Sequence, residues 1–248
     1  MRSRISITLV AVTLILSSSV ARAQKSNKFE DAQQRAQDAA RIITLLGILP
    51  ESDLPRELVD RAQAIAVFPK VTKQTALLTS LTQGFGVISA RTESGWTMPA
   101  FYRFAGGSWA NPFGKSETTG LVLLFMSKDA IAWLEKGGIE LKDEKRAIEG
   151  PVGALNDEQR KQLEGAHLVV YAYFNGKLSG KTFDSSFWKT FVLNPDNNIN
   201  SPLYGMKGRD VLAGVKIDAK LVIPATIPTY TEALHKYYSA TKTSAANQ

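Results

Sequence analysis

Residues 118–134 read TTGLVLLFMSKDAIAWL, and this stretch decides the fold more than any other. The run Leu121–Met126 is apolar on both faces, which is typical of a central strand covered on both sides. Ser127 follows as a helix N-cap, and the next residues predict a short helix closed by Gly137 and Gly138. A buried strand that leads directly into a helix indicates helices packed on a sheet.

Upstream of this stretch, the spacing of apolar residues changes from a helical to a strand period. Apolar residues recur at intervals of three and four over Phe29–Leu49, which predicts an amphipathic helix. A shorter helix is expected over Pro55–Ala62, capped by Ser52 or Asp53. Segments rich in β-branched and aromatic residues then predict strands at Ala64–Phe68 (stopped by Pro69), Thr75–Thr82, Gly86–Arg91 and Thr97–Phe104.

Downstream, turn and cap signals divide the rest of the chain. Asn156 is expected to cap another helix, and Asn175-Gly176 is the strongest two-residue hairpin signal in the sequence. The remaining expectations are strands at His167–Phe174 and Lys177–Phe183, a loop over Asn194–Gly208 and a helix over Tyr230–Tyr238. We therefore expect an α+β fold: a single domain built on an antiparallel β-sheet or partial barrel, with N-terminal, lateral and C-terminal helices.

The first residues have the pattern of a secretory signal peptide. Arg2 and Arg4 precede an apolar run over Ile5–Leu16, and Ala21-Arg22-Ala23 is a small-x-small cleavage pattern. An uncleaved anchor is the alternative, but the run is shorter than the about 20 residues that span a bilayer. We predict a signal peptide over 1–23, cleaved near Ala23, a domain over 24–240 and a flexible tail over 241–248. The expected location is periplasmic or secreted.

Composition excludes several classes of chemistry. The 248 residues include 30 Lys and Arg against 23 Asp and Glu, two His and no Cys. The absence of Cys excludes disulfides, thiolate metal sites and a Cys nucleophile, so neither a cofactor nor a metal is expected. After cleavage, 27 basic and 23 acidic residues remain, a net charge of +4. This mild excess permits an anionic partner, but nucleic acid is not expected in an exported chain without a basic run.

No stretch of the sequence assembles a catalytic site. The segment Asn175–Thr182 misses the phosphate-loop pattern GxxxxGK[ST] by one residue, and the helix that this pattern requires is not predicted after it. No Gly-x-Ser-x-Gly elbow is present, and His167 and His235 fit a strand edge and a solvated helix. Because nucleophile, base and oxyanion donors cannot be named together, we expect a protein that is not an enzyme.

Basic residues are spread through the Gly- and aromatic-rich first half, and they are the candidate site. One interpretation places them on a single basic face, beside aromatic side chains, that contacts an anionic lipid surface. The other places the aromatic residues in the core and leaves the basic residues as a solvated rim. The candidate lipid-binding residues are Lys70, Lys73, Arg91, Arg103 and Lys115.

Six segments together resemble the SYLF domain family, which is also described as an actin-binding regulator domain in fungal endocytic proteins. Their order along the chain matches that of the family, and they extend over roughly Arg41–Leu234. The segments are AIAVFPKV (Ala64–Val71), TMPAFYRFAGGS (Thr97–Ser108), TTGLVLLFMSKDAIAWL (Thr118–Leu134), IEGPVGA (Ile148–Ala154), VVYAYFNGKLSG (Val169–Gly180) and NSPLYGMKGRDVLAG (Asn200–Gly214).

The resemblance implies a lipid-binding module and not an enzyme. Members of the family bind phosphoinositides and, in fungi, actin; actin binding is not expected of an exported chain. By position, Lys70 and Lys73 match basic residues that follow the family's Val-Phe-Pro motif. The sequence departs from the family after Lys73, where it is rich in Thr and Leu, and in the hairpin, where a cation is missing. The alternative function is an envelope scaffold that recognises another protein.

Overall fold

The computed structural model describes residues 27–48, 54–76, 79–106, 119–136, 139–140, 147–174, 176–180 and 191–246. For residues 73–76, 79–81, 139–140 and 238–246 the description is limited to the backbone. The expected signal peptide, Lys115 and the Gly137-Gly138 helix end lie outside the described residues.

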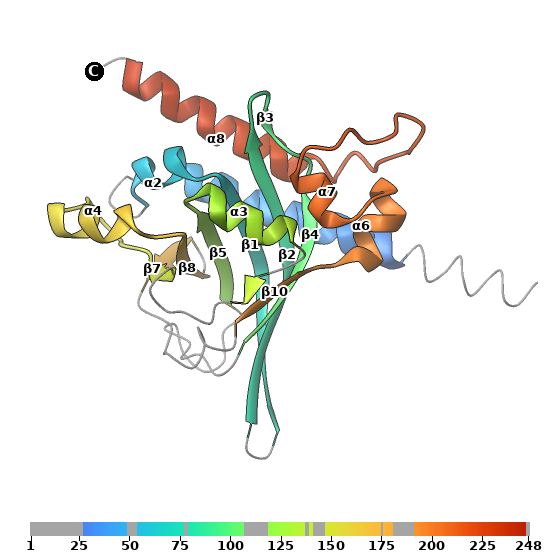
Figure 1. The fold of residues 1–248 in the computed structure, drawn as a ribbon, viewed down its shortest axis with the longest axis horizontal. Helices are drawn as coiled ribbons and strands as arrows, with labels where there is room; N and C mark the ends of the chain where they lie inside the picture. The colour runs from blue at the N-terminus through green and yellow to red at the C-terminus, as the bar shows by residue number, and fades with distance from the viewer. Residues whose placement is uncertain are drawn as a thin grey trace, which may run out of the picture.

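One ten-stranded sheet organises the described chain, and helices pack against it (Figure 1). The strand order is β6-β10-β4-β2-β1-β5-β8-β7, with β3 paired to β2 and β9 paired to β8. The strands are β1 (Ala64–Ala76), β2 (Thr79–Thr92), β3 (Gly95–Trp96), β4 (Ala100–Gly106), β5 (Thr119–Phe125), β6 (Ile139–Glu140), β7 (Ala147–Glu149), β8 (Leu168–Phe174), β9 (Lys177–Ser179) and β10 (Val192–Pro195). The α+β fold predicted from the sequence is confirmed.

The apolar stretch Thr119–Phe125 lies inside the sheet, between β1 and β8. Every residue of β5 is buried, and the strand pairs with β1 on one side and β8 on the other. Ser127 caps helix α3 (Lys128–Glu135), and its side chain accepts a hydrogen bond from the Ala130 amide, as predicted. Asn156 likewise caps helix α4 (Asp157–Glu164) in a reciprocal capping box with Gln159.

One pairing departs from the antiparallel expectation. β7 pairs with β8 in parallel, and α4 is the helix between these two strands in the chain. Parallel neighbours require a crossover connection because a tight turn can join only antiparallel strands. The lateral helix is therefore the crossover of a β-α-β unit, and the sheet is mixed.

Helices cover both faces of the sheet. The N-terminal helix (residues 27–48) and helix α8 (Thr229–Ala246) lie on one face, where Thr231 is 3.4 Å from Ser89 and the Tyr230 hydroxyl donates to the Ile65 carbonyl. Helices α3 and α7 (Gly208–Leu212) contact each other, and α7 contacts β4 (Figure 1). The N-terminal helix confirms the amphipathic period, and α8 extends beyond the expected end at Tyr238.

The expected end of the first strand at Pro69 is wrong. β1 continues through Pro69 to Ala76, and β2 is one strand where the sequence predicted two separate segments. The ladder between β1 and β2 has an irregularity between Val67 and Lys70. A bulge leaves a residue without a ladder hydrogen bond, so proline, which has no N–H, is tolerated there. Beyond Lys73, β1 and β2 extend away from the body as a two-stranded ribbon (Figure 1).

The expected loop over Asn194–Gly208 is also wrong. The segment contains the end of β10, helix α6 (Asn197–Tyr204) and the start of α7. One of its asparagines, Asn200, serves a tertiary contact and is fully buried. The Asn200 side chain accepts a hydrogen bond from the Phe101 amide and donates one to the Phe101 carbonyl, both at 2.8 Å. The asparagine therefore joins α6 to β4.

Smaller corrections concern helix caps. Helix α2 (Arg56–Arg61) begins after Pro55, which occupies the N-cap position without a side-chain hydrogen bond. The expected caps Ser52 and Asp53 lie outside the described residues.

Within the part of the chain that the structure describes, no helix combines the length and apolar character that would span a bilayer.

Candidate functional site

A bulge in β1 determines the direction of Lys70. Val67 pairs with Val87, and a regular antiparallel ladder would then place Lys70 opposite Gly84. The observed partner of Lys70 is Phe85, because β1 contains one extra residue at Phe68–Pro69. A shift of one residue turns a side chain to the other face of a sheet. The bulge therefore places Lys70 on the same face as Phe85.

Two glycines direct Phe85 to that face. A Cβ atom on Gly84 would lie 2.3 Å from the Phe104 ring, and one on Gly86 would lie 2.1 Å from the Val67 carbonyl oxygen. The rings of Phe104 and Phe68, which pack edge to face at 5.0 Å between centroids, occupy the space on the glycine side. Alternation along β2 then directs Phe85 to the opposite face, where 40% of its surface remains exposed.

The predicted cations Lys70 and Arg103 lie on either side of Phe85. Phe85 pairs with Lys70 on β1 and with Arg103 on β4, and Arg103 pairs in turn with Asn194 on β10. Residues opposite each other in a ladder share one face, and neighbouring strands lie about 4.8 Å apart. The Cα atoms of Lys70 and Arg103 are consequently about 10 Å apart, on either side of Phe85, and both side chains are exposed.

A third cation reaches the ring from the N-terminal helix. The Arg35 guanidinium carbon lies 4.5 Å from the centroid of the Phe85 ring. Arg35 also bonds to Asp31 on its own helix and, at 3.0 Å, to Asp196 beside β10. Its charge is therefore balanced by two carboxylates. We call Arg35, Lys70, Phe85 and Arg103 the basic–aromatic cluster.

The cations of the basic–aromatic cluster differ in whether a carboxylate neutralises their charge. No Asp or Glu among the described residues forms an ion pair with Lys70 or Arg103, in contrast to Arg35. The cluster thus presents two uncompensated positive charges beside a half-exposed aromatic ring. Such a surface can receive an anionic group and, next to it, an apolar one.

Arg91 also lies on this face of β2 but makes different contacts. It is six residues along the strand from Phe85, a separation of about 20 Å. Its guanidinium donates to the carbonyl oxygens of Ala62 at 3.0 Å and Val59 at 3.1 Å, and it stacks 4.6 Å from the Trp96 ring centroid. These carbonyls belong to the C-terminal end of α2, so Arg91 holds that helix against the sheet.

The other two predicted cations are placed less fully. The backbone of Lys73 lies in the β1 ribbon opposite Thr82, and its side chain is not described. Lys115 lies outside the described residues. The structure therefore brings Lys70 and Arg103 together and places Arg91 elsewhere.

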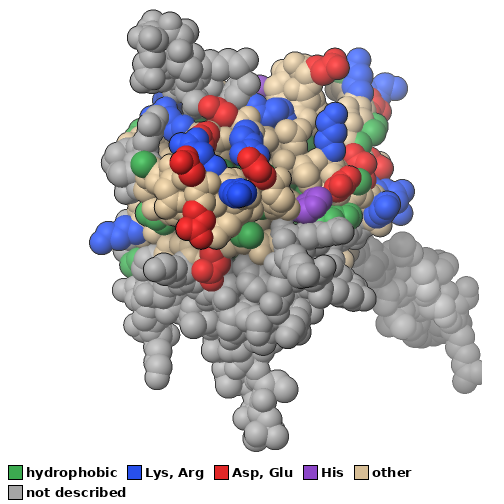
Figure 2. All heavy atoms as spheres, turned by 60° about the vertical axis from the view of Figure 1, so that its left-hand side comes forward, with side chains coloured by type: hydrophobic (Ala, Val, Ile, Leu, Met, Phe, Trp, Pro, Cys, Tyr) green, Lys and Arg blue, Asp and Glu red, His purple; other side chains and the backbone are tan. Residues whose placement is uncertain are grey.

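The face formed by α2 and α4 has a different charge pattern. Figure 2 shows this side of the molecule, and Lys and Arg side chains are interspersed there with Asp and Glu. Arg160 of α4, for example, bonds to Glu57 of α2 at 2.7 Å. Mixed charge of this kind is typical of a solvated surface and does not favour one sign of ligand.

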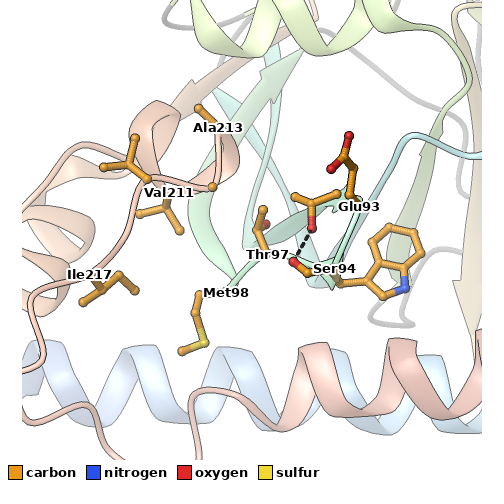
Figure 3. A pocket seen from close by; sticks show the side chains of 11 residues that line it. Glu93, Ser94, Thr97, Met98, Val211, Ala213 and Ile217 are labelled. Carbon is orange, nitrogen blue, oxygen red and sulfur yellow. Dashed lines mark hydrogen bonds between the residues drawn. The ribbon is translucent and has the colours of Figure 1, made fainter.

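A pocket of about 650 Å³ lies between the β2–β3 turn and the segment after α7 (Figure 3). One wall carries Thr92, Glu93 and Ser94, and the other is apolar and includes Val211 and Ile217. Glu93 is the charged side chain in its lining, so the pocket does not favour an anion. It is separate from the basic–aromatic cluster, none of whose members line it.

One Ser–His pair lies as close as the two residues of a catalytic dyad. The Ser127 Oγ atom lies 2.6 Å from His167 Nδ1, and the His167 ring packs 5.1 Å from Trp133. The same Oγ atom accepts the Ala130 amide as the cap of α3. Among the described residues, no carboxylate bonds to His167, and no group of three His, Asp or Glu side chains could hold a metal ion. The contact fixes a helix end.

Buried tyrosines support the sheet around these surfaces. Burial raises the pKa of Tyr102, Tyr171, Tyr204 and Tyr230 above the usual 10.0, with Asp210 and Glu135 adding to the effect at Tyr102. The hydroxyls of Tyr204 and Tyr230 donate to the carbonyls of Pro99 and Ile65. Among the described residues, the Tyr102 hydroxyl has no hydrogen-bond partner. These tyrosines remain neutral at physiological pH, so they contribute packing and no charge.

Sequence reasoning missed two members of the basic–aromatic cluster. Phe85 was assigned to a break between strands, although its glycine neighbours are the signal of close packing on one face. Arg35 lies within the amphipathic helix predicted over Phe29–Leu49, and nothing local indicates its contact with a ring 50 positions later. Comparison of the sequence with models of known protein families and with curated proteins finds no match.

Proposed function

We propose that the protein is a non-enzymatic module that binds anionic phospholipid through the basic–aromatic cluster. The observation that carries the proposal is the row formed by Lys70, Phe85 and Arg103, in which two exposed cations without an ion pair to a described carboxylate flank an exposed ring. The resemblance of six segments to SYLF domains points in the same direction, toward an exported lipid-binding member of that family.

The arrangement fits the chemistry of a lipid surface. Lys70 and Arg103 would bind phosphate groups, and each cation close to an anionic membrane contributes about 1 kcal/mol. Phe85 would lie at the level of the headgroups, where aromatic rings are favoured. Two cations and one ring make a weak contact, so binding should require a multivalent anionic surface. Salt should weaken it, because exposed charges are screened over about 8 Å at physiological ionic strength.

Vesicle co-sedimentation of the purified protein tests the proposal. Vesicles of phosphatidylcholine alone are compared with vesicles that also contain phosphatidylglycerol, across a series of salt concentrations. We expect binding to the anionic vesicles only, decreasing as salt rises. Equal binding to both, or binding that salt does not change, would contradict the proposal.

A charge reversal locates the binding surface. The double variant Lys70→Glu with Arg103→Glu should lose about 100-fold or more in vesicle affinity, because two attractions become two repulsions. Lys128→Glu with Lys177→Glu makes the same change of charge at two other exposed positions, on α3 and β9. This control should bind much better than the first variant. Equal losses would show that net charge, and not the basic–aromatic cluster, governs binding.

The alternative function is an envelope scaffold without a specific lipid ligand. An exposed ring between two cations also fits an acidic segment of a protein partner. Pull-down from an envelope extract before and after removal of lipid distinguishes the two, since a protein partner survives delipidation. Recovery of one partner at equal yield in both extracts, without vesicle binding, would favour the scaffold.

A further inference from the structure

The segment between α7 and α8 presents apolar side chains to solvent. Val222 is 92% exposed, Val215 is 51% exposed and Leu221 is 36% exposed. In Figure 1 this segment forms the loop that stands out from the body beyond α7. We call residues 213–224 the apolar loop. Exposed apolar side chains that gather in one segment among polar residues are typical of a contact site.

Hydrogen bonds and core contacts hold the shape of the apolar loop. The Val215 amide donates to the Asp210 carbonyl, and the amide of Leu221 donates to the Asp218 carbonyl, both at 3.0 Å. Ile217 and Ile223 pack against the core from within the loop. The protruding side chains are therefore presented by a formed turn, so ordering them on binding requires little further loss of conformational entropy.

Charge around the protruding side chains identifies the kind of partner. Lys216 and Lys220 are exposed beside Val215 and Leu221, and neither forms an ion pair with a described carboxylate. Asp218 is the acidic residue within the loop, and its side chain accepts the Lys220 amide at 2.9 Å. Exposed apolar side chains with lysines next to them in the chain fit a bilayer surface, whose phosphates lie outside its acyl chains.

We propose that the apolar loop inserts Leu221 and Val222 into the headgroup region of an anionic membrane while Lys216 and Lys220 bind its phosphates. This inference rests on the proposed function and adds a second membrane contact to the basic–aromatic cluster. A convex apolar tip favours a lipid surface over a protein partner, because protein hot spots are enriched in large aromatic and Arg anchors that fill pockets.

A single-cysteine label tests the insertion. The sequence contains no Cys, so Val222→Cys can be labelled uniquely with a polarity-sensitive fluorophore. On addition of phosphatidylglycerol-containing vesicles, emission should shift to the blue and be quenched by lipids that carry a quencher in their acyl chains. The control Lys161→Cys places the same label on exposed α4 and should not respond.

An affinity measurement completes the test. The variant Leu221→Ser with Val222→Ser should bind the same vesicles at least about tenfold more weakly, with little change in melting temperature because the side chains are exposed. If Val222 labels stay unshifted while the wild-type protein binds vesicles, the loop inference fails and the proposed function stands. If the wild-type protein binds no vesicle, both fail. A lipid-free dimer that the serine variant abolishes would overturn the membrane assignment in favour of a second copy.

Discussion

The two ends of one sheet face carry the same kinds of side chain and use them differently. At one end, which we call the closed end because α2 covers it, the Arg91 guanidinium bonds to the carbonyls of Val59 and Ala62 and stacks on Trp96. At the other end, which we call the open end because its side chains are exposed, Lys70 and Arg103 flank the Phe85 ring without a described acidic partner. A cation beside an aromatic ring is thus a structural element in one place and, under the proposed function, a binding element in the other. Hydrogen bonding to the backbone is what distinguishes them.

The largest expected effect is a loss of folding stability at alkaline pH. It arises from the buried tyrosines and not from the exposed cations. Unfolded tyrosine loses its proton near pH 10, whereas burial raises the pKa of Tyr102, Tyr171, Tyr204 and Tyr230 above that value. Above pH 10 the unfolded state therefore binds fewer protons. The free energy of unfolding should fall by about 1.4 kcal/mol per pH unit for each of these tyrosines. Urea unfolding at pH 9, 10 and 11 measures this, and unchanged stability would contradict it.

Removal of Arg91 should come next in size, and it should affect folding only. Arg91→Ala removes the guanidinium that donates to the carbonyls of Val59 and Ala62 and stacks on Trp96, which should lower the free energy of unfolding by about 2–3 kcal/mol. The melting temperature should fall by about 5–10 °C. Differential scanning calorimetry measures the change. The melting temperature of Arg91→Lys should lie between those of the wild type and Arg91→Ala, since a lysine cannot reproduce both hydrogen bonds.

Removal of the ring at the open end should affect binding more than folding. Phe85→Ala should weaken binding to anionic vesicles by about tenfold through lost contact with the headgroup region. Stability should fall by no more than about 1.5 kcal/mol, because the ring is only partly buried. Isothermal titration with vesicles gives the affinity. Phe85→Leu, which keeps apolar bulk, should restore part of the binding, and full binding by the alanine variant would remove Phe85 from the site.

The smallest expected effect separates two buried tyrosines. Tyr102→Phe deletes a hydroxyl that bonds to no described residue, so the free energy of unfolding should stay equal or rise by up to about 1 kcal/mol. Tyr204→Phe deletes a hydroxyl that donates to Pro99 at 2.7 Å, and should lower it by about 1 kcal/mol. Urea unfolding of both variants decides the sign. The same change in both would show that the Tyr102 hydroxyl has a partner in solution.

Local sequence patterns predicted the elements whose signals are local. Ser127 and Asn156 are recognisable as caps, because a cap bonds to an amide three residues away. The buried strand at Thr119–Phe125 is recognisable because both of its faces are apolar. The same patterns failed at Pro69, where a bulge carries a proline through a strand, and at Asn200, where a buried amide serves a strand about 100 residues earlier.

The candidate site was predictable in composition and not in arrangement. Lys70 and Arg103 were identified as cations near aromatic residues, but their common face depends on the extra residue in β1. Arg91 also lies near aromatic residues in the sequence, and its hydrogen bonds in the structure show that it holds α2 against the sheet. Register and side-chain partners arise from tertiary packing, which one sequence does not display.

The most direct measurement compares the two ends of the face in one assay. Affinity for phosphatidylglycerol-containing vesicles is measured for Lys70→Glu with Arg103→Glu and for Arg91→Ala, at a temperature where both are folded by circular dichroism. We predict that the first variant loses binding and keeps its stability, while the second keeps binding and loses stability. Retained binding by the first variant, or equal loss in both, would contradict the assignment of the open end as the lipid-binding site.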